Sequence, residues 1–385
     1  MTSHEDPYAV HSVVETPGCN PVEGRVAWDP AHSLWNGGMM LGALVGGPLL
    51  FSWSAFAVFL LLTGAGLLLG HSVGLHRRLI HGSFDCPLWL ERFLVWVGVA
   101  VGMSGPFWMI RTHDLRDWAQ RQPNCHPYLR HGAPMWLDAL WQLHGRLDLA
   151  RPPRFDIPPR IANDPFYRWL ERTWMAQQLP IAALLYLAGG WSFVVWGVCA
   201  RVFASVTGHW FVGHLAHTKG PQTWMVDGAG VQAHDVPWAG IPTMGEAWHN
   251  NHHAYPGSAR IGLYPGQSDW GFVFIRLLAR AGLAWNVRTP ETLPERGCLK
   301  AAPTTRNLLP LVGRRKKENR PSRPAPVVVA LSHDLGGGSA ALGHPHRDPG
   351  VGRGGAGGGA VGGHGVGEAV GPGPHGAEAG GVLLP

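Results

Sequence analysis

Two long runs of apolar residues dominate the pattern of this chain. Residues 37–70 contain no charged side chain, and residues 173–208 contain only Arg201. A helix that spans a membrane needs about 20 apolar residues. The first run therefore forms one long helix or two short ones with a turn at residues 52–54. In the second run Gly189-Gly190 lies near the middle, where it suits a tight hairpin.

The distribution of arginine predicts how these runs cross the membrane. Residues 71–172, between the two runs, contain 13 Arg, and the two expected turns contain no Lys or Arg. Cytoplasmic loops carry an excess of Lys and Arg, so residues 71–172 are expected in the cytoplasm. The segment after His217 is also basic, with Lys219 and Arg260 among its cations. Both segments then lie on one side, which requires two spans in the second run.

Three further segments differ from these runs. Residues 87–110 are apolar but contain Glu91 and Arg92, so we expect a buried or interfacial segment that does not span. Residues 1–36 lack the basic start and apolar core of a secretory signal and are expected to be a cytosolic segment. Residues 296–385 are expected to be a disordered tail, first basic and then rich in glycine, whose abrupt composition suggests an artefactual end.

Composition narrows the class of protein. Only 15% of the 385 residues are charged, against about 25% in an ordinary soluble domain. The net charge of +6 is concentrated in residues 313–325, which we interpret as a solvated linker, so no nucleic-acid partner is expected. The five cysteines form no C-x-x-C pair, which excludes a zinc ribbon. The unusual count is histidine, with 22 residues, of which 14 lie between His71 and His253.

The densest histidine cluster reads His249-Asn250-Asn251-His252-His253. Positions i, i+3 and i+4 share one face of a helix, so three imidazoles could converge there. Neutral imidazole binds iron, copper, nickel or zinc. A polar surface turn that happens to be rich in histidine is the alternative.

A second cluster, His76 to His81, directly follows the first apolar run. A spacing of five places the two side chains about 140° apart on an ideal α-helix. They converge on one site only if the helix ends between them. Otherwise they face different metal ions.

Two more clusters complete the pattern. His113 and Asp117 are four residues apart and could share a metal, although an Arg–Asp surface network explains them equally well. His209, His214 and His217 follow the second apolar run. All of these clusters abut membrane segments on the side expected to be cytoplasmic, which favours a metal centre. The single E-x-x-H, Glu246 to His249, lacks the second copy that carboxylate-bridged di-iron bundles use.

At these residues the sequence resembles the integral-membrane fatty acid desaturases, especially the acyl-CoA desaturases, over roughly residues 35–295. The matching motifs are the box from His76 to His81, the box from Gly245 to His253, and Ala216-His217-Thr218-Lys219-Gly220, which is similar to an isolated A-H-x-x-G motif. The resemblance implies an all-α integral membrane fold over residues 37–295, with four transmembrane helices in two hairpins. A cytosolic helical cap would carry the histidine boxes.

The resemblance also implies the chemistry. Two iron ions, with O2 as co-substrate, would introduce a cis double bond into a fatty acyl chain carried by CoA or a lipid. The electrons would come from a donor of the ferredoxin or cytochrome b5 type with its reductase. The implied ligands are His76, His81, His113, His217, His249, His252 and His253. Three further candidate ligands are Asp117, His209 and His214.

The chain departs from this family pattern in its second box. Where the family has H-x-x-H-H, this sequence has His113, Arg116 and Asp117, and Gly213 stands where acyl-CoA desaturases have a water-binding Asn. A different ligand set leaves hydroxylation of the lipid chain as an alternative reaction. A non-catalytic membrane metal-handling protein is a third hypothesis. Four unassigned histidines could fill the gap: His126, His131, His144 and His234.

Overall fold

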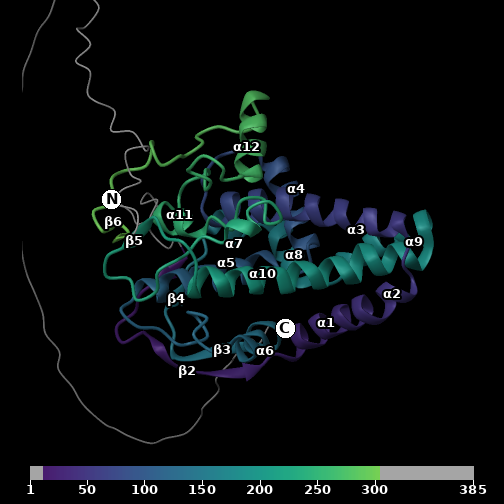
Figure 1. Cartoon of the computed structure of the whole chain (residues 1–385), viewed down its shortest axis with the longest axis horizontal. Helices are drawn as coiled ribbons and strands as arrows, with labels where there is room; N and C mark the ends of the chain where they lie inside the picture. Colours follow the sequence, from purple (N-terminus) through teal and green to yellow (C-terminus); the bar gives the residue numbers. More distant parts are fainter. Residues whose placement is uncertain (1–11, 304–385) are drawn as a thin grey trace, which may run out of the picture. The chain divides into compact units, whose positions relative to one another are not determined.

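The computed structural model describes residues 12–303, and two helical hairpins are its longest part (Figure 1). In the first hairpin, α1 (Pro30–Leu41), η1 (Gly42–Gly46) and α2 (Gly47–Leu49) form one continuous arm. The returning arm consists of α3 (Trp53–Ala65) and η2 (Gly66–Ile80). Ser52 ends the turn between them, because its hydroxyl accepts a hydrogen bond from the amide of Ala55 at 3.1 Å.

The second hairpin runs through α9 (Gln178–Val194), η3 (Val195–Ala200) and α10 (Arg201–Thr218). The chain reverses inside α9, where the backbone of Gly189 is not helical and Gly190 has a φ of 65°. A left-handed φ is readily adopted only by glycine, so the sequence itself places this turn. The tips of the two hairpins meet where Ser192 donates a hydrogen bond to the carbonyl of Leu50 at 2.7 Å.

The arms have apolar surfaces. Two helical stretches are long and apolar enough to cross a membrane, Trp53–Ile80 and Gln178–Thr218. Their exposed apolar side chains include Leu60, Leu61, Leu184 and Leu187. Exposed leucines over such a length are typical of a surface that faces lipid. The turn at Gly189-Gly190 is confirmed, whereas the first turn lies at residues 50–52, slightly earlier than predicted. Helix α1 begins at Pro30, before the apolar run, because the Asp29 carboxylate accepts a capping hydrogen bond from the amide of His32.

Shorter helices gather at one end of the arms (Figure 1). They are α4 (Leu88–Ala100), α5 (Pro106–Arg121), α6 (Met135–His144), α7 (Pro159–Ala162), α8 (Pro165–Thr173), η4 (Pro237–Ala239), α11 (His249–Ala254) and α12 (Trp270–Arg280). Helix α4 buries Leu94 and Val95 and exposes Trp89 and Phe93. Helix α4 is thus buried on one face and exposed on the other, and it is not among the described helices that are long and apolar enough to cross a membrane.

Very close packing joins η2 to α4. A Cβ atom added to Gly70 would lie 2.3 Å from the backbone nitrogen of Gly98, and one added to Gly74 would lie 2.5 Å from the carbonyl of Leu94. Only glycine permits this approach. The core beside it draws on several of the helices and includes Leu75, Leu79, Val95, Val99, Ile110, Tyr167 and Leu170.

The fold is mostly helical but not all-α as expected, because residues 12–303 also contain three small antiparallel sheets. They pair β1 (Val13–Val14) with β4 (Arg154–Phe155), β2 (Asn20–Trp28) with β3 (Gly145–Arg151), and β5 (Trp224–Val226) with β6 (Leu299–Ala301). Apolar and polar residues alternate in the longest pair: Val26 lies opposite Leu147, and Arg25 opposite Asp148. Strand β6 lies within the segment expected to be a tail, whose residues 304–385 lie outside the described part.

Candidate metal centre

A first cluster of imidazoles lies at the end of the arms where the shorter helices gather, which we call the cap. One ring nitrogen from each of His76, His81, His113 and His252 lies within 4.8 Å of the others. His76 is on η2, His81 ends that helix, His113 is on α5 and His252 is on α11. Four histidines from three separate elements thus face one point.

The shape of η2 explains how His76 and His81 converge. This segment is a π-helix, and the amide of His81 donates a hydrogen bond to the carbonyl of His76, five residues earlier. In a π-helix residues five apart lie almost above one another, unlike in an α-helix. The Nε2 atoms of the two rings are 3.2 Å apart. The expected divergence of 140° therefore does not occur.

A second cluster lies beside the first. It contains His217 from α10 and His249 and His253 from α11, with one ring nitrogen from each within 4.8 Å of the others. The Nε2 atom of His249 lies 3.1 Å from that of His217 and 3.0 Å from that of His253. Two nitrogens bound to the same ion at about 2.1 Å, with a right angle between the two bonds, are about 3 Å apart. The spacing in this cluster thus fits one metal ion.

Neighbouring oxygen atoms hold several of these rings with Nε2 directed inward. Nδ1 of His217 donates a hydrogen bond to the carbonyl of Gly213 at 2.8 Å, and Nδ1 of His76 lies 2.7 Å from Oε2 of Glu246. A proton on Nδ1 leaves the Nε2 lone pair for a metal, which is the usual arrangement around metal-binding histidines. The carboxylate of Glu246 is itself fixed by Arg77 at 3.1 Å and Ser72 at 2.5 Å.

The three histidines of α11 have the protonation that a metal requires. Burial holds the pKa of His252 and of His249 well below the usual range and lowers that of His253 to about 4. These three imidazoles are therefore neutral at physiological pH, and neutral imidazole is the form that binds metals. For His113 burial lowers the pKa, but the nearby carboxylates of Asp117 and Asp114 raise it above its usual value. His252 is 2% exposed, and neither of its ring nitrogens has a hydrogen-bond partner. A bound metal would satisfy this buried donor set.

A third group, His131, Asp138 and His214, could hold a metal by distance alone. Its atoms are already satisfied, however. One carboxylate oxygen of Asp138 accepts hydrogen bonds from Nδ1 of His131, Nδ1 of His214 and Nε1 of Trp210, each at 2.8 Å. We interpret this group as a hydrogen-bonded support of the second cluster, because the His131 ring stacks on His217 with centroids 5.3 Å apart.

This support explains the presence of Arg116 in the second box, where the family has a histidine. Arg116 donates a hydrogen bond to Nε2 of His131 at 2.8 Å and another to Gln142 at 2.8 Å. Of the four unassigned histidines, His131 is the one that the fold brings to the gap. Sequence spacing did not indicate it, since it lies in a loop with a φ of 54°. Asp138 did leave a signal, because it is the only charged residue in the otherwise apolar start of α6.

Of the three further candidate ligands, Asp117 and His209 belong to none of the three groups, and His214 belongs to the third group with His131 and Asp138. Asp117 is 8% exposed and lies 3.5 Å from Arg121. Although its burial raises the pKa, electrostatic interactions with His113, His253 and Arg121 hold the pKa of Asp117 far below its usual value. The carboxylate is therefore ionised and lies near one histidine of each cluster. His209 contacts His71 instead, with ring centroids 4.9 Å apart.

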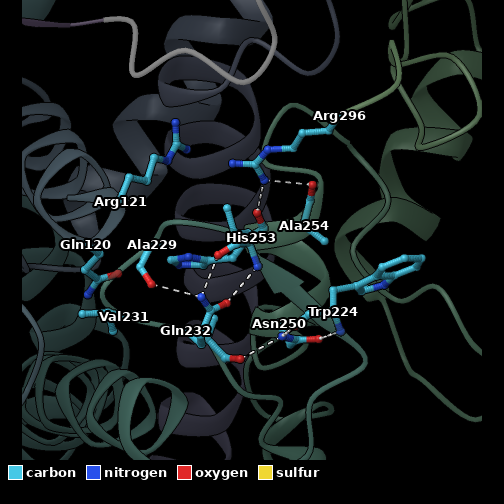
Figure 2. A pocket seen from close by; sticks show the side chains of 12 residues that line it. Gln120, Arg121, Trp224, Ala229, Val231, Gln232, Asn250, His253, Ala254 and Arg296 are labelled. Carbon is cyan, nitrogen blue, oxygen red and sulfur yellow. Dashed lines mark hydrogen bonds between the residues drawn. The ribbon is translucent and has the colours of Figure 1, made fainter. Parts of the chain in front are cut away.

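A pocket lined by both polar and apolar residues lies against the second cluster at His253 (Figure 2). Gln120, Arg121, Trp224, Gln232 and Asn250 are among its lining residues. Arg296 closes one side, where its guanidinium donates hydrogen bonds to the carbonyls of His253 at 2.6 Å and Ala254 at 3.1 Å. These bonds satisfy the last carbonyls of α11 and fix the end of the helix that carries three of the histidines.

Two histidine clusters that could hold metal ions lie at the base of apolar arms, and this combination is typical of membrane-associated metalloproteins. Comparison with known proteins is more specific. Residues 51–260 match the family model for fatty acid desaturases. An sn-2 palmitoyl-lipid 9-desaturase of Nostoc sp. (strain 36) is 35% identical over 246 residues, which are 62% of this chain and 84% of that protein. An sn-1 stearoyl-lipid 9-desaturase of Anabaena variabilis is 36% identical over 268 residues, 69% of this chain and 96% of that protein.

A plant relative differs in the carrier of its substrate. The acyl-CoA 5-desaturase AL21 of Anemone leveillei is 32% identical over 272 residues, 70% of this chain and 82% of that protein. The chain belongs to the fatty acid desaturase family. It is an oxidoreductase that desaturates fatty acyl chains.

Proposed function

We propose that the chain binds two iron ions, one in each histidine cluster, and uses O2 to introduce a cis double bond into a fatty acyl chain. The observation that supports this most strongly is the convergence of histidine ring nitrogens in two adjacent clusters. Imidazole ligands suit iron. In this proposal His76, His81, His113 and His252 bind one iron, and His217, His249 and His253 bind the other.

Asp117 is the proposed oxygen ligand of the second site. That cluster supplies three nitrogens, and the expected histidine of the second box is replaced by Arg116, which is hydrogen-bonded to His131. The ionised carboxylate of Asp117 interacts electrostatically with both His113 and His253. The proposal leaves His209 and His214 out of the ligand set, because each has another contact in the fold.

Iron held by these histidines would supply the O2 activation needed to remove two hydrogens from neighbouring methylenes. The protein's part is to hold the ligands rigid and the reacting carbons in place. Glu246 orients His76, and the carbonyl of Gly213 orients His217. Asp138 anchors His131 and His214 behind the second cluster. The apolar core of η2, α4 and α5 excludes water from the side that it covers.

For the membrane, we propose four spans with the clusters facing the cytoplasm. Each hairpin contributes two arms, and the first arm, Pro30–Leu49, is continuous helix with exposed apolar residues such as Leu44 and Leu49. The Arg-rich segments that carry the clusters support a cytoplasmic position. The acyl chain would then reach the iron site from the bilayer, between the arms.

The carrier of the acyl chain and the electron donor follow from chemistry and similarity. Relatives with acyl-lipid and acyl-CoA substrates both match this chain, so we propose an acyl-lipid or acyl-CoA substrate. The reaction consumes two electrons beyond those of the substrate. A ferredoxin or a cytochrome b5-type donor with its reductase would supply them.

The experiment is a fatty-acid profile of cells that express the full chain, compared with cells that express His252→Ala. Gas chromatography with mass spectrometry should find a new cis-unsaturated chain only with the wild-type protein. A product that gains one oxygen without losing two hydrogens would identify a hydroxylase instead. Equal unsaturation with His252→Ala would contradict the proposed iron site. His234→Ala is the matched control, because the His234 ring donates a hydrogen bond to the loop carbonyl of Gly220 and belongs to neither histidine cluster.

A further inference from the structure

Two imidazoles outside the metal clusters face each other across the membrane arms. His71 on η2 and His209 on α10 form a perpendicular ring contact with centroids 4.9 Å apart. Each lies further from the cap along its helix than the cluster histidines do: His71 precedes His76, and His209 precedes His217. The pair therefore lies on the arm side of the metal clusters, where an acyl chain would approach them.

This pair is close to both clusters without belonging to either. His71 interacts electrostatically with Glu246, His76 and His113 around the first cluster. His209 interacts electrostatically with Arg116 and His131, which lie behind the second. Neither residue offers a nitrogen that joins the groups able to hold a metal ion. The pair is thus a separate polar feature beside the reacting centre.

The hydrogen-bonding capacity of the pair is not used within the protein. Nδ1 of His71 is buried and has no hydrogen-bond partner. The ring of His209, by contrast, is exposed although it contacts His71. No atom lies within 4 Å of a Cβ placed on the neighbouring Gly208. A ligand could therefore approach the pair from the exposed side of His209.

Two further buried polar atoms without partners lie on α10 and on α3, the helix that continues into η2. The hydroxyl of Thr63 on α3 and that of Ser205 on α10 are buried without hydrogen-bond partners. Ser205 and His209 are four residues apart and share one face of α10. An unpaired polar atom in an apolar region costs free energy unless a ligand supplies its partner. A plain alkyl chain could not supply one.

We propose that His71 and His209 form a binding site for an oxygen atom carried by the acyl chain, a hydroxyl or a carbonyl at or near the methylene pair that reacts. The preferred substrate class is then an oxygenated acyl chain. A neutral imidazole can donate one hydrogen bond and accept another, so the pair can bind either kind of oxygen. This inference rests on the proposed function, since it places the bound oxygen beside the metal clusters.

The test compares stearoyl chains with hydroxystearoyl chains that carry a mid-chain hydroxyl, supplied on the same carrier to the full chain in membranes. The wild-type protein should prefer the hydroxylated chain about tenfold in kcat/KM, which corresponds to about 1.4 kcal/mol. His71→Leu and His209→Leu should each bring this ratio close to one. His209→Gln, which keeps a donor and an acceptor, should restore part of it, and His234→Leu should leave it unchanged.

A second measurement keeps the inference testable if a variant loses its iron. Calorimetric titration of metal-free wild-type protein with each lipid should show tighter binding of the hydroxylated chain, and His209→Leu should abolish the difference. Equal binding of both chains by the wild type would overturn the inference and would indicate that the pair holds only a water molecule. Absence of a double bond in either chain, with the binding difference intact, would instead contradict the proposed function alone.

Discussion

Nδ1 of His131 donates a hydrogen bond to Oδ2 of Asp138 at 2.8 Å, and this contact joins two residues that no histidine box contains. Asp138 is fully buried, and its burial would raise its pKa, but the hydrogen bonds from His131, Trp210 and His214 hold the pKa far below its usual value. The other ring nitrogen of His131 accepts from Arg116. The altered second box is therefore tied to the second cluster through this buried network.

Asp138→Ala should be strongly destabilising. The substitution leaves three N–H groups without their acceptor, and each buried unsatisfied donor costs about 1–3 kcal/mol. We expect a clear fall in the unfolding temperature of the detergent-solubilised protein, measured by circular dichroism. Asp138→Asn keeps one carboxamide oxygen and should lie between the wild type and Asp138→Ala. Equal stability of all three proteins would show that the network does not support the fold.

Asp235 predicts a specific pH dependence of stability. Burial raises its pKa to about 7, even though the amide of Asn250 donates a hydrogen bond to its carboxyl group at 3.0 Å. The folded chain thus holds this proton more tightly than the unfolded chain, whose ordinary value is 3.8. Its contribution to stability is complete below pH 3.8 and is lost as the pH rises to about 7.

Asp235→Asn removes this titration. The free energy of unfolding of the wild type, relative to that of Asp235→Asn, should fall by up to about 4 kcal/mol between pH 4 and pH 7. Chemical denaturation of both proteins across this range measures the difference, and all other titrating groups cancel. A constant difference would mean that Asp235 is ionised throughout.

Gly70→Ala should disrupt the packing of η2 on α4. The new Cβ atom would lie 2.3 Å from the backbone nitrogen of Gly98, and backbone at this contact cannot rotate away as a side chain could. Overpacking of this kind costs typically about 1–3 kcal/mol. Thermal unfolding should show the loss. Gly37→Ala is the matched control, since nothing lies within 4 Å of its Cβ position, and an equal effect of both would refute the packing argument.

Much of the scaffold was predictable because its signals are local. The lack of charge in residues 37–70 indicated the first hairpin, and Gly189-Gly190 marked the turn of the second. The spacing of His249, His252 and His253 indicated a shared helix, but these residues divide between two clusters. Which ring joins which cluster depends on where α5 and α10 bring His113 and His217, and this is not encoded in local spacing.

The remaining parts of the site depend on distant contacts. His76 and His81 converge because η2 is a π-helix, and an α-helical geometry predicted the opposite. His131 reaches the gap in the second box from a loop with positive φ, which no periodicity marks. Asp138 could have been suspected from its charge within an apolar helix, but its three donors come from residues 131, 210 and 214.

The iron content of the purified full chain tests the central claim most directly. Elemental analysis by inductively coupled plasma mass spectrometry should find about two iron atoms per chain, one for each cluster of a two-metal site. His252→Ala and His253→Ala should each retain about one or fewer, whereas His234→Ala should retain the wild-type content. Zinc without iron in the wild-type protein, or full iron content in both cluster variants, would contradict the proposed metal centre.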